Sequence, residues 1–324
     1  MRIANNVLEV IGNTPLVRLN RVVGHGAAEV CVKLEYLNPS GSTKDRIALQ
    51  MVRSAERDGR LRPGGTIIEA STGNTAAALA CVAAVKGYKM VVFTPEAVAS
   101  PERLKISRSF GAEVRPINTK AVEAQLVQEG EAAHGGIWEI IPRMLCKQME
   151  EQDPAGCWWA RQFKNPDNVA AHRETTGREI IEQTDGEVDA FVASIGTGGT
   201  LLGVAQALKA RNPAVRIIAV EPAGASMLLK GKDGLPMIEG VTDGLVLDIL
   251  DSGIVDQVIT VDDEHAIAMA HRLAEEEGLL CGMSSGANVV AALQVAKELG
   301  KSKRVVTVLV DRRERYFTVE KYVT

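Results

Sequence analysis

The chain has 324 residues, of which 46% are hydrophobic and 24% charged, values that exclude collagen-like, disordered and coiled-coil proteins. Its formal net charge of −4 argues against a dedicated nucleic-acid-binding protein. Aromatic residues make up only 4%, so the apolar content is mostly aliphatic, as in helices packed on buried parallel strands. At roughly 150 residues per domain, the length favours two domains or one large one.

The first twenty residues lack the pattern of a signal peptide, and no apolar run reaches the roughly 18 residues of a membrane span. We therefore expect a cytoplasmic protein with no membrane partner. The five cysteines have no CxxC spacing, and the five histidines do not stand at metal spacing, so we expect no metal site. Cys31 and Cys81 lie in apolar runs and are expected to be buried, whereas His265 and His271 are expected on the surface.

Short β-rich runs alternate with longer helical patterns along the chain. The predicted strands are 29–34, 66–69, 90–94, 113–116, 190–194, 216–220, 258–261 and 304–310. The predicted helices are 45–57, 74–86, one from Pro101, 201–210, one that starts at the acidic run 262–264, and 289–299. Strands separated by helices predict βαβ units and parallel sheets. The polar stretch 150–156 is the predicted link between two such α/β units.

In open α/β sheets, chemistry gathers in the loops that leave the carboxyl ends of strands. After the first predicted strand, small residues lead to Lys44 at the start of a helix. A helix N-terminus disfavours a nearby cation, so the pKa of Lys44 can fall and its amine can become a nucleophile. The alternative is a solvated lysine on a turn.

The next such loop reads Ser71-Thr72-Gly73-Asn74-Thr75. Hydroxyl, amide and backbone N–H groups at a helix start suit a carboxylate ligand. Simple N-capping of the following helix is the alternative.

A third loop, Gly196-Thr197-Gly198-Gly199-Thr200, lies between a predicted strand and a predicted helix. It has no following Gly-Lys-Ser/Thr, and Leu201 stands where a dinucleotide fingerprint needs its third glycine. The loop therefore predicts a site for a single phosphate, with a tight turn as the alternative. Near the C-terminus, Ser284 lies in a similar but weaker Ser- and Gly-containing loop before a helix.

Taken together, these loops resemble the cysteine synthase and cystathionine β-synthase family of fold-type II enzymes, which depend on pyridoxal 5′-phosphate. The resemblance spans nearly the whole chain. Its motifs, in family order, are 11–17, 39–46, 69–75, 162–168, 175–180, 196–200 and 276–288, followed less faithfully by 311–317. Several motifs in one order make the match specific.

The resemblance implies an α/β fold like that of the tryptophan synthase β subunit, with two domains of largely parallel sheet and the cofactor between them. A smaller, mobile domain would contain 1–12 and 36–157. A larger domain would contain 13–35 and 158–324. The resemblance also implies a homodimer.

The resemblance assigns site roles as well. Lys44 would form the Schiff base with pyridoxal phosphate and act as the catalytic base. Gly196, Thr197, Gly198, Gly199 and Thr200 would bind its phosphate, Asn74 its ring hydroxyl, and Ser284 its pyridine nitrogen. The substrate carboxylate would bind to Ser71, Thr72, Gly73, Thr75 and Gln162, and Gly240 and Asp243 would face the substrate. No residue is assigned to a metal.

The implied reaction is β-replacement on an activated L-serine. In its simplest form, O-acetyl-L-serine and sulfide give L-cysteine and acetate through an aminoacrylate intermediate. Related reactions with another donor or nucleophile remain open: cystathionine synthesis, diaminopropionate-precursor synthesis, or cysteine desulfhydration. A non-catalytic binding protein on the same fold is a further alternative, and the retained Lys44 argues against it.

Three segments depart from the family pattern. Asp243 brings a negative charge into a loop that is usually uncharged, or it points to solvent. Segment 311–317 carries two arginines where small residues are common; it slightly resembles the thiosulfate-using branch, but we expect a charged surface turn. The stretch 130–157 is about a dozen residues longer than usual, and its apolar spacing predicts an extra helix. That helix would cap the site, reshape the nucleophile pocket, join a dimer interface, or only pack; all three tryptophans lie within it or just after it.

Overall fold

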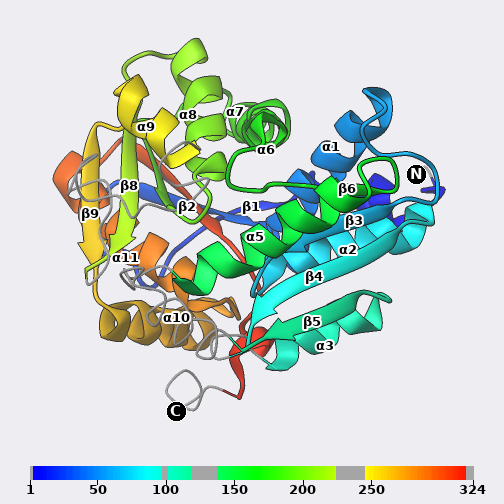
Figure 1. The fold of residues 1–324 in the computed structure, drawn as a ribbon. Helices are drawn as coiled ribbons and strands as arrows, with labels where there is room; N and C mark the ends of the chain where they lie inside the picture. Colours follow the sequence, from blue (N-terminus) through cyan, green and yellow to red (C-terminus); the bar gives the residue numbers. More distant parts are fainter. Residues whose placement is uncertain (1–2, 97–100, 119–136, 224–244, 319–324) are drawn as a thin grey trace, which may run out of the picture.

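The computed structural model describes residues 3–96, 101–118, 137–223 and 245–318. Their strands form a six-stranded sheet of order β1-β2-β10-β7-β8-β9 and a four-stranded sheet of order β5-β4-β3-β6 (Figure 1). All strand pairs in this part of the chain are parallel except β1–β2. The predicted α/β class with largely parallel sheets is confirmed.

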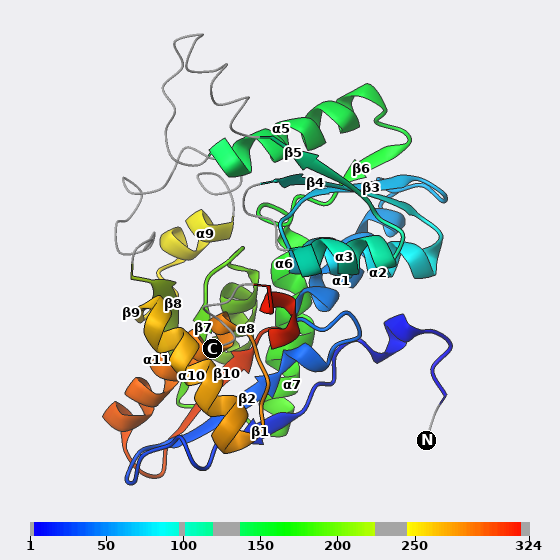
Figure 2. The same cartoon turned by 90° about the horizontal axis from the view of Figure 1, so that it is seen from below.

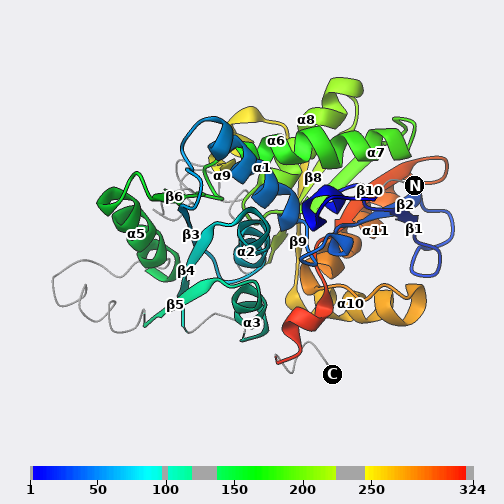
Figure 3. The same ribbon diagram turned by 90° about the vertical axis from the view of Figure 1, so that its right-hand side faces the viewer.

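The four-stranded sheet consists of β3 (Thr66–Ala70), β4 (Lys89–Pro95), β5 (Glu113–Ile117) and β6 (Cys157–Trp159). Helices α1 (Lys44–Arg57), α2 (Asn74–Lys86) and α3 (Pro101–Ser109) lie on one face, and α5 (Ile137–Gln152) covers the other (Figures 2 and 3). Strand alternation explains the two layers: Ile67 packs with the core of α1 and α2, whereas Ile68 packs with Cys146 of α5.

The six-stranded sheet consists of β1 (Leu16–Arg18), β2 (Glu29–Leu34), β7 (Ala190–Ser194), β8 (Arg216–Pro222), β9 (Gln257–Val261) and β10 (Arg304–Leu309). Helices α10 (Asp263–Glu277) and α11 (Met283–Leu299) pack on one face through the cluster that contains Val30 and Val32. The core on the other face contains Cys31 and Phe191 and receives α8 (Gly199–Arg211) and α9 (Leu245–Ser252). The segment α6 (Pro166–Ala171), η3 (a π-helical turn, His172–Gly177) and α7 (Arg178–Gln183) packs beside α8.

All eight predicted strands are present, with ends shifted by at most two residues. The prediction missed the short elements β1, β6, α6, α7 and α9. It was wrong about the start of the last long helix: α11 begins at Met283, after Gly282 in extended conformation, so Ser284 lies in its first turn rather than in a loop. The predicted link 150–156 likewise begins inside α5.

The expected extra helix is present as α5. The division into domains stays a prediction, and β6 crosses its proposed boundary at 157/158. Cys31 and Cys81 are buried as predicted; His265 is exposed, whereas His271 is half-buried against Arg313. Across the described ranges, no helix has both the length and the apolar character needed to span a membrane. The same ranges hold no cluster of three or more His, Cys, Asp or Glu side chains that could bind a metal.

Candidate active site

A cavity of about 290 Å³ lies at the carboxyl ends of the central strands of the six-stranded sheet. Its volume is near the lower end of the roughly 300–1,000 Å³ typical of small-molecule sites. The predicted site residues that line it are Lys44, Gly196, Thr197, Gly198, Thr200 and Ser284. Three segments that are distant in sequence thus meet around one cavity.

Lys44 is the first residue of α1, and the loop before it is fastened to the end of β10. The Thr43 amide donates to Val310 O at 2.9 Å, and the Arg312 amide donates to Gly41 O at 3.3 Å. Burial lowers the pKa of the Lys44 amine, although the negative charges of Asp311 and Glu35 oppose the shift. A larger share of this amine is therefore neutral near pH 7 than for a solvated lysine. Lys44 is half-buried at the cavity, rather than fully solvated on a turn.

The loop 196–200 joins β7 to α8 and leaves room for an anion at the start of that thirteen-residue helix. Gly198 adopts a φ of +89°, which favours glycine, and no described atom other than its chain neighbours lies within 4 Å of a Cβ built on Gly196. A Cβ on Gly199 would collide with the amide of Asn168. Open space, backbone N–H groups and hydroxyls at a helix N-terminus fit a phosphate group.

Asn168, on α6, is a site residue to which the sequence analysis gave no role. Its Nδ2 donates to Gln162 O at 2.8 Å and to Thr197 Oγ1 at 2.9 Å. It therefore joins the predicted carboxylate site to the predicted phosphate loop. Its place inside the quoted motif 162–168 was the only signal that pointed to it.

The predicted carboxylate-binding residues form a second group around the start of α2. Thr75 Oγ1 donates to Gln162 Oε1, and Gln162 Nε2 donates to Ala70 O at 3.2 Å. The Ser71 hydroxyl accepts from the amides of Gly73 and Ala76, which is the capping role considered above. Thr72 is half-buried beside it. Gly240 and Asp243 lie outside the described residues.

Segment 311–317 is not the expected surface turn. Asp311 is fully buried, and Arg313 and Arg315 are also buried. Asn74 Nδ2 donates to Asp311 Oδ2 at 2.6 Å, and Arg315 Nη1 donates to Asn74 Oδ1 at 2.8 Å. The Tyr316 hydroxyl also donates to Asp311 Oδ2, at 2.6 Å. These hydrogen bonds offset the desolvation cost of the buried charges. They also place Asn74 between a carboxylate and a guanidinium.

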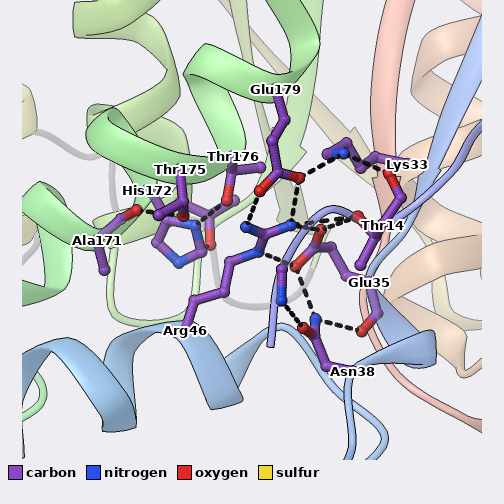
Figure 4. Close-up of polar contacts among 12 residues, drawn as sticks. Thr14, Lys33, Glu35, Asn38, Arg46, Ala171, His172, Thr175, Thr176 and Glu179 are labelled. Carbon is purple, nitrogen blue, oxygen red and sulfur yellow. Dashed lines mark hydrogen bonds and ion pairs between the residues drawn. The ribbon is translucent and has the colours of Figure 1, made fainter. Parts of the chain in front are cut away.

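His172, the first residue of the π-helical turn η3, connects that turn to the phosphate loop. Its Nε2 lies 3.1 Å from Thr200 Oγ1. Its Nδ1 lies 2.9 Å from Thr176 Oγ1 within η3 (Figure 4). Burial, followed by the charge of Lys44, lowers the pKa of His172 to about 3, so the ring carries one N–H at neutral pH. If Nε2 carries the proton, it donates to Thr200 and leaves the Thr200 hydroxyl free to donate to a phosphate.

Replacing His172 with phenylalanine is expected to weaken cofactor binding about tenfold, because the Thr200 hydroxyl loses its buried partner. Titration of the apoprotein with pyridoxal phosphate, followed by absorbance, measures the dissociation constant. Phenylalanine in place of exposed His265 is the matched control. An unchanged dissociation constant for His172→Phe would contradict the expectation.

Behind Lys44, Arg46 of α1 enters a buried ion-pair network (Figure 4). Its guanidinium contacts Glu35 at 2.7 Å and Glu179 at 2.6 Å, and Lys33 contacts Glu179 at 2.8 Å. Thr14 and Asn38 donate to the two oxygens of Glu35. The network joins α1 to β2 and α7 directly behind the site.

This donor set fits pyridoxal phosphate: a half-buried lysine with a lowered pKa, a phosphate loop, and the Ser284 hydroxyl border one cavity. Residues 7–311 match the family model described as "Pyridoxal-phosphate dependent enzyme". A cysteine synthase of Staphylococcus aureus is 43% identical over 319 residues, covering 98% of this chain and 97% of that protein.

Two solved structures are also similar. One is a cysteine synthase from Entamoeba histolytica, with a TM-score of 0.84 and 38% identity over 100% of this chain and 92% of that one. The other is an O-ureido-L-serine synthase, with a TM-score of 0.84 and 37% identity over 99% of this chain and 96% of that one.

Proposed function

The chain belongs to the family of pyridoxal-phosphate-dependent enzymes, and we propose that it converts O-acetyl-L-serine and sulfide into L-cysteine and acetate. The observation that carries the proposal is the position of Lys44. Its amine lines a cavity shared with a phosphate loop and a neutral hydroxyl, and its pKa is lowered by burial.

Pyridoxal phosphate supplies an electron sink for the α-carbon of a bound amino acid. We assign Lys44 to hold it covalently, Gly196–Thr200 to its phosphate, Asn74 to its ring hydroxyl, and Ser284 to its ring nitrogen. A serine hydroxyl does not enforce a protonated ring as an aspartate would, which favours elimination at the β-carbon over transamination.

Thr75 and Gln162, with 71–73, are proposed to bind the substrate carboxylate and so to fix the α-carbon near Lys44. The neutral Lys44 amine then removes the α-proton, and the Cβ–O bond breaks as acetate departs. Sulfide adds to the β-carbon, and Lys44 returns the proton to the α-carbon. Gly240 and Asp243 stay proposed substrate contacts.

Stopped-flow spectroscopy of the cofactor-loaded enzyme tests the donor and the nucleophile separately. We expect O-acetyl-L-serine to change the cofactor spectrum within one turnover and sulfide to reverse that change. Thiosulfate, homocysteine and diamines serve as competing nucleophiles. If another nucleophile reverses the change and sulfide does not, the chain catalyses one of the related replacements.

We further propose that the enzyme is a cytoplasmic homodimer. The family resemblance supports the dimer.

A further inference from the structure

Helix α5 contacts the segment 159–163, which contains Gln162, at two points. Both contacts come from the same face of the helix. Arg143, Cys146 and Glu150 stand at i, i+3 and i+7, so they share one face of the helix. Figure 3 shows this helix against the side of the sheet formed by β3, β4 and β6. Arg143 and Cys146 are both buried, so this face points into the protein.

The first point of attachment is Glu150, which contacts residues that precede Gln162 in the chain. Its Oε1 accepts from the Trp159 amide at 2.9 Å and from Arg161 Nη1 at 3.1 Å, and its Oε2 pairs with Arg161 Nη2. The Arg161 guanidinium lies 4.5 Å from the centre of the Trp159 ring. The residue before Gln162 is therefore fixed to α5.

The second point of attachment is Arg143, whose guanidinium lies 4.1 Å from the centre of the Phe163 ring. This is a cation–π contact, and Arg143 makes it with only 4% of its surface exposed. The residue after Gln162 is therefore also fixed to α5.

Beneath Gln162 lies Glu69, the penultimate residue of β3. Its carboxylate accepts from the Gln162 amide at 3.0 Å, from Trp159 Nε1 at 3.1 Å and from the Ala70 amide at 2.8 Å. Burial raises the pKa of Glu69, while these three N–H groups and the charge of Arg143 oppose the shift. Glu69, Arg143 and Phe163 line one small pocket together with Gln162.

We propose that α5 and Glu69 form a clamp that positions Gln162 for the substrate carboxylate, and that Arg143 and Glu150 are its positioning residues. The inference rests on the proposed carboxylate-binding role of Gln162. The Gln162 side chain already contacts Thr75 and Ala70 O, so a small shift of its backbone disturbs the whole carboxylate site. The clamp does not contact the cavity around Lys44. Its loss should therefore weaken donor binding selectively.

The test compares Arg143→Met and Glu150→Gln with two exposed neighbours on the same helix, Lys147→Met and Glu151→Gln. We expect each clamp variant to raise the KM for O-acetyl-L-serine about five- to tenfold, in keeping with loss of a partly desolvated cation–π contact or charged hydrogen bond. The KM for sulfide and the dissociation constant for pyridoxal phosphate should stay unchanged. Arg143→Lys, which keeps a cation over Phe163, should restore part of the donor affinity.

Binding of L-alanine, which has no leaving group, gives a readout without turnover. Its dissociation constant, from the change in cofactor absorbance, should rise in the same proportion as the KM for the donor. In the Gln162→Ala background, Arg143→Met should add no further effect, because its influence passes through Gln162.

The outcomes separate the two hypotheses. If Gln162→Ala leaves L-alanine binding unchanged, the proposed role of Gln162 is wrong. If Gln162→Ala weakens binding but neither clamp variant does, the clamp is wrong and the role of Gln162 stands. If a clamp variant raises the KM for the donor, the KM for sulfide and the dissociation constant for pyridoxal phosphate equally, the substitution destabilises the protein in general. That result would also overturn the clamp.

Discussion

Replacing Lys44 with alanine should reduce turnover by at least about 10²- to 10⁴-fold and remove the visible absorption of the cofactor bound through that lysine. The physical reason is that no other amine lines the cavity in the described part of the chain. Alanine there removes both the covalent anchor and the base for the α-proton. Absorbance of the purified protein with added pyridoxal phosphate, together with steady-state rates, measures both effects.

Lys147→Ala is the matched control, because Lys147 is an exposed lysine on α5. It should leave the spectrum and the rates unchanged. If wild-type protein supplied with pyridoxal phosphate shows no such absorption, the chain is a non-catalytic relative. If Lys44→Ala retains both absorption and turnover, the assignment of this lysine is wrong.

The pH dependence follows from the direction of the Lys44 pKa shift. Burial lowers this pKa, and the amine acts as a base only when neutral, so the rate should rise with pH and level off at a lower pH than an ordinary lysine allows. Asp311 opposes the lowering. The variant Asp311→Asn should therefore move the acidic limb to still lower pH, which a pH–rate profile measures.

The loops around Lys44 and Gly196–Thr200 could be predicted because each is a short run of residues whose chemistry is local: a helix start, small residues and hydroxyls after a strand. Asn168 and His172 could not, because their roles arise only when α6 and η3 pack against α8. Neither has a sequence neighbour that reveals its partner.

The burial of charged side chains was also not predicted from the sequence. Segment 311–317 looks like a surface turn because arginines are mostly exposed, and that rule fails when partners come from elsewhere in the chain. Arg315 donates hydrogen bonds to Asn74 Oδ1 and Ser40 O, which lie more than 200 residues away in the sequence. The same reasoning applies to Glu69, whose three N–H donors include Trp159 and Gln162 of the segment after α5.

The network behind the site gives the largest expected effect on stability. Replacing Arg46 with methionine should lower the free energy of unfolding by about 3–5 kcal/mol at neutral pH, because Glu35 and Glu179 are then left buried with only Lys33 to balance them. Arg57→Met, on the same helix but exposed, should change it by less than about 1 kcal/mol. Urea unfolding followed by circular dichroism measures both.

Lowering the pH should reduce the difference in the free energy of unfolding between the wild type and Arg46→Met. In the wild type, burial opposes ionisation of Glu35, but the charge and hydrogen bonds of Arg46 prevail and lower the pKa of Glu35 to about 2. A pKa below the unfolded value of 4.5 stabilises the fold above that pH, and this contribution disappears as the pH falls from 4.5 towards 2.

Without Arg46, burial dominates and the Glu35 pKa rises above its unfolded value. The variant then gains relative stability as Glu35 takes up a proton. The deficit should therefore be largest near pH 7 and shrink on acidification, and a deficit that grows on acidification would show that Glu35 does not depend on Arg46 for its charge.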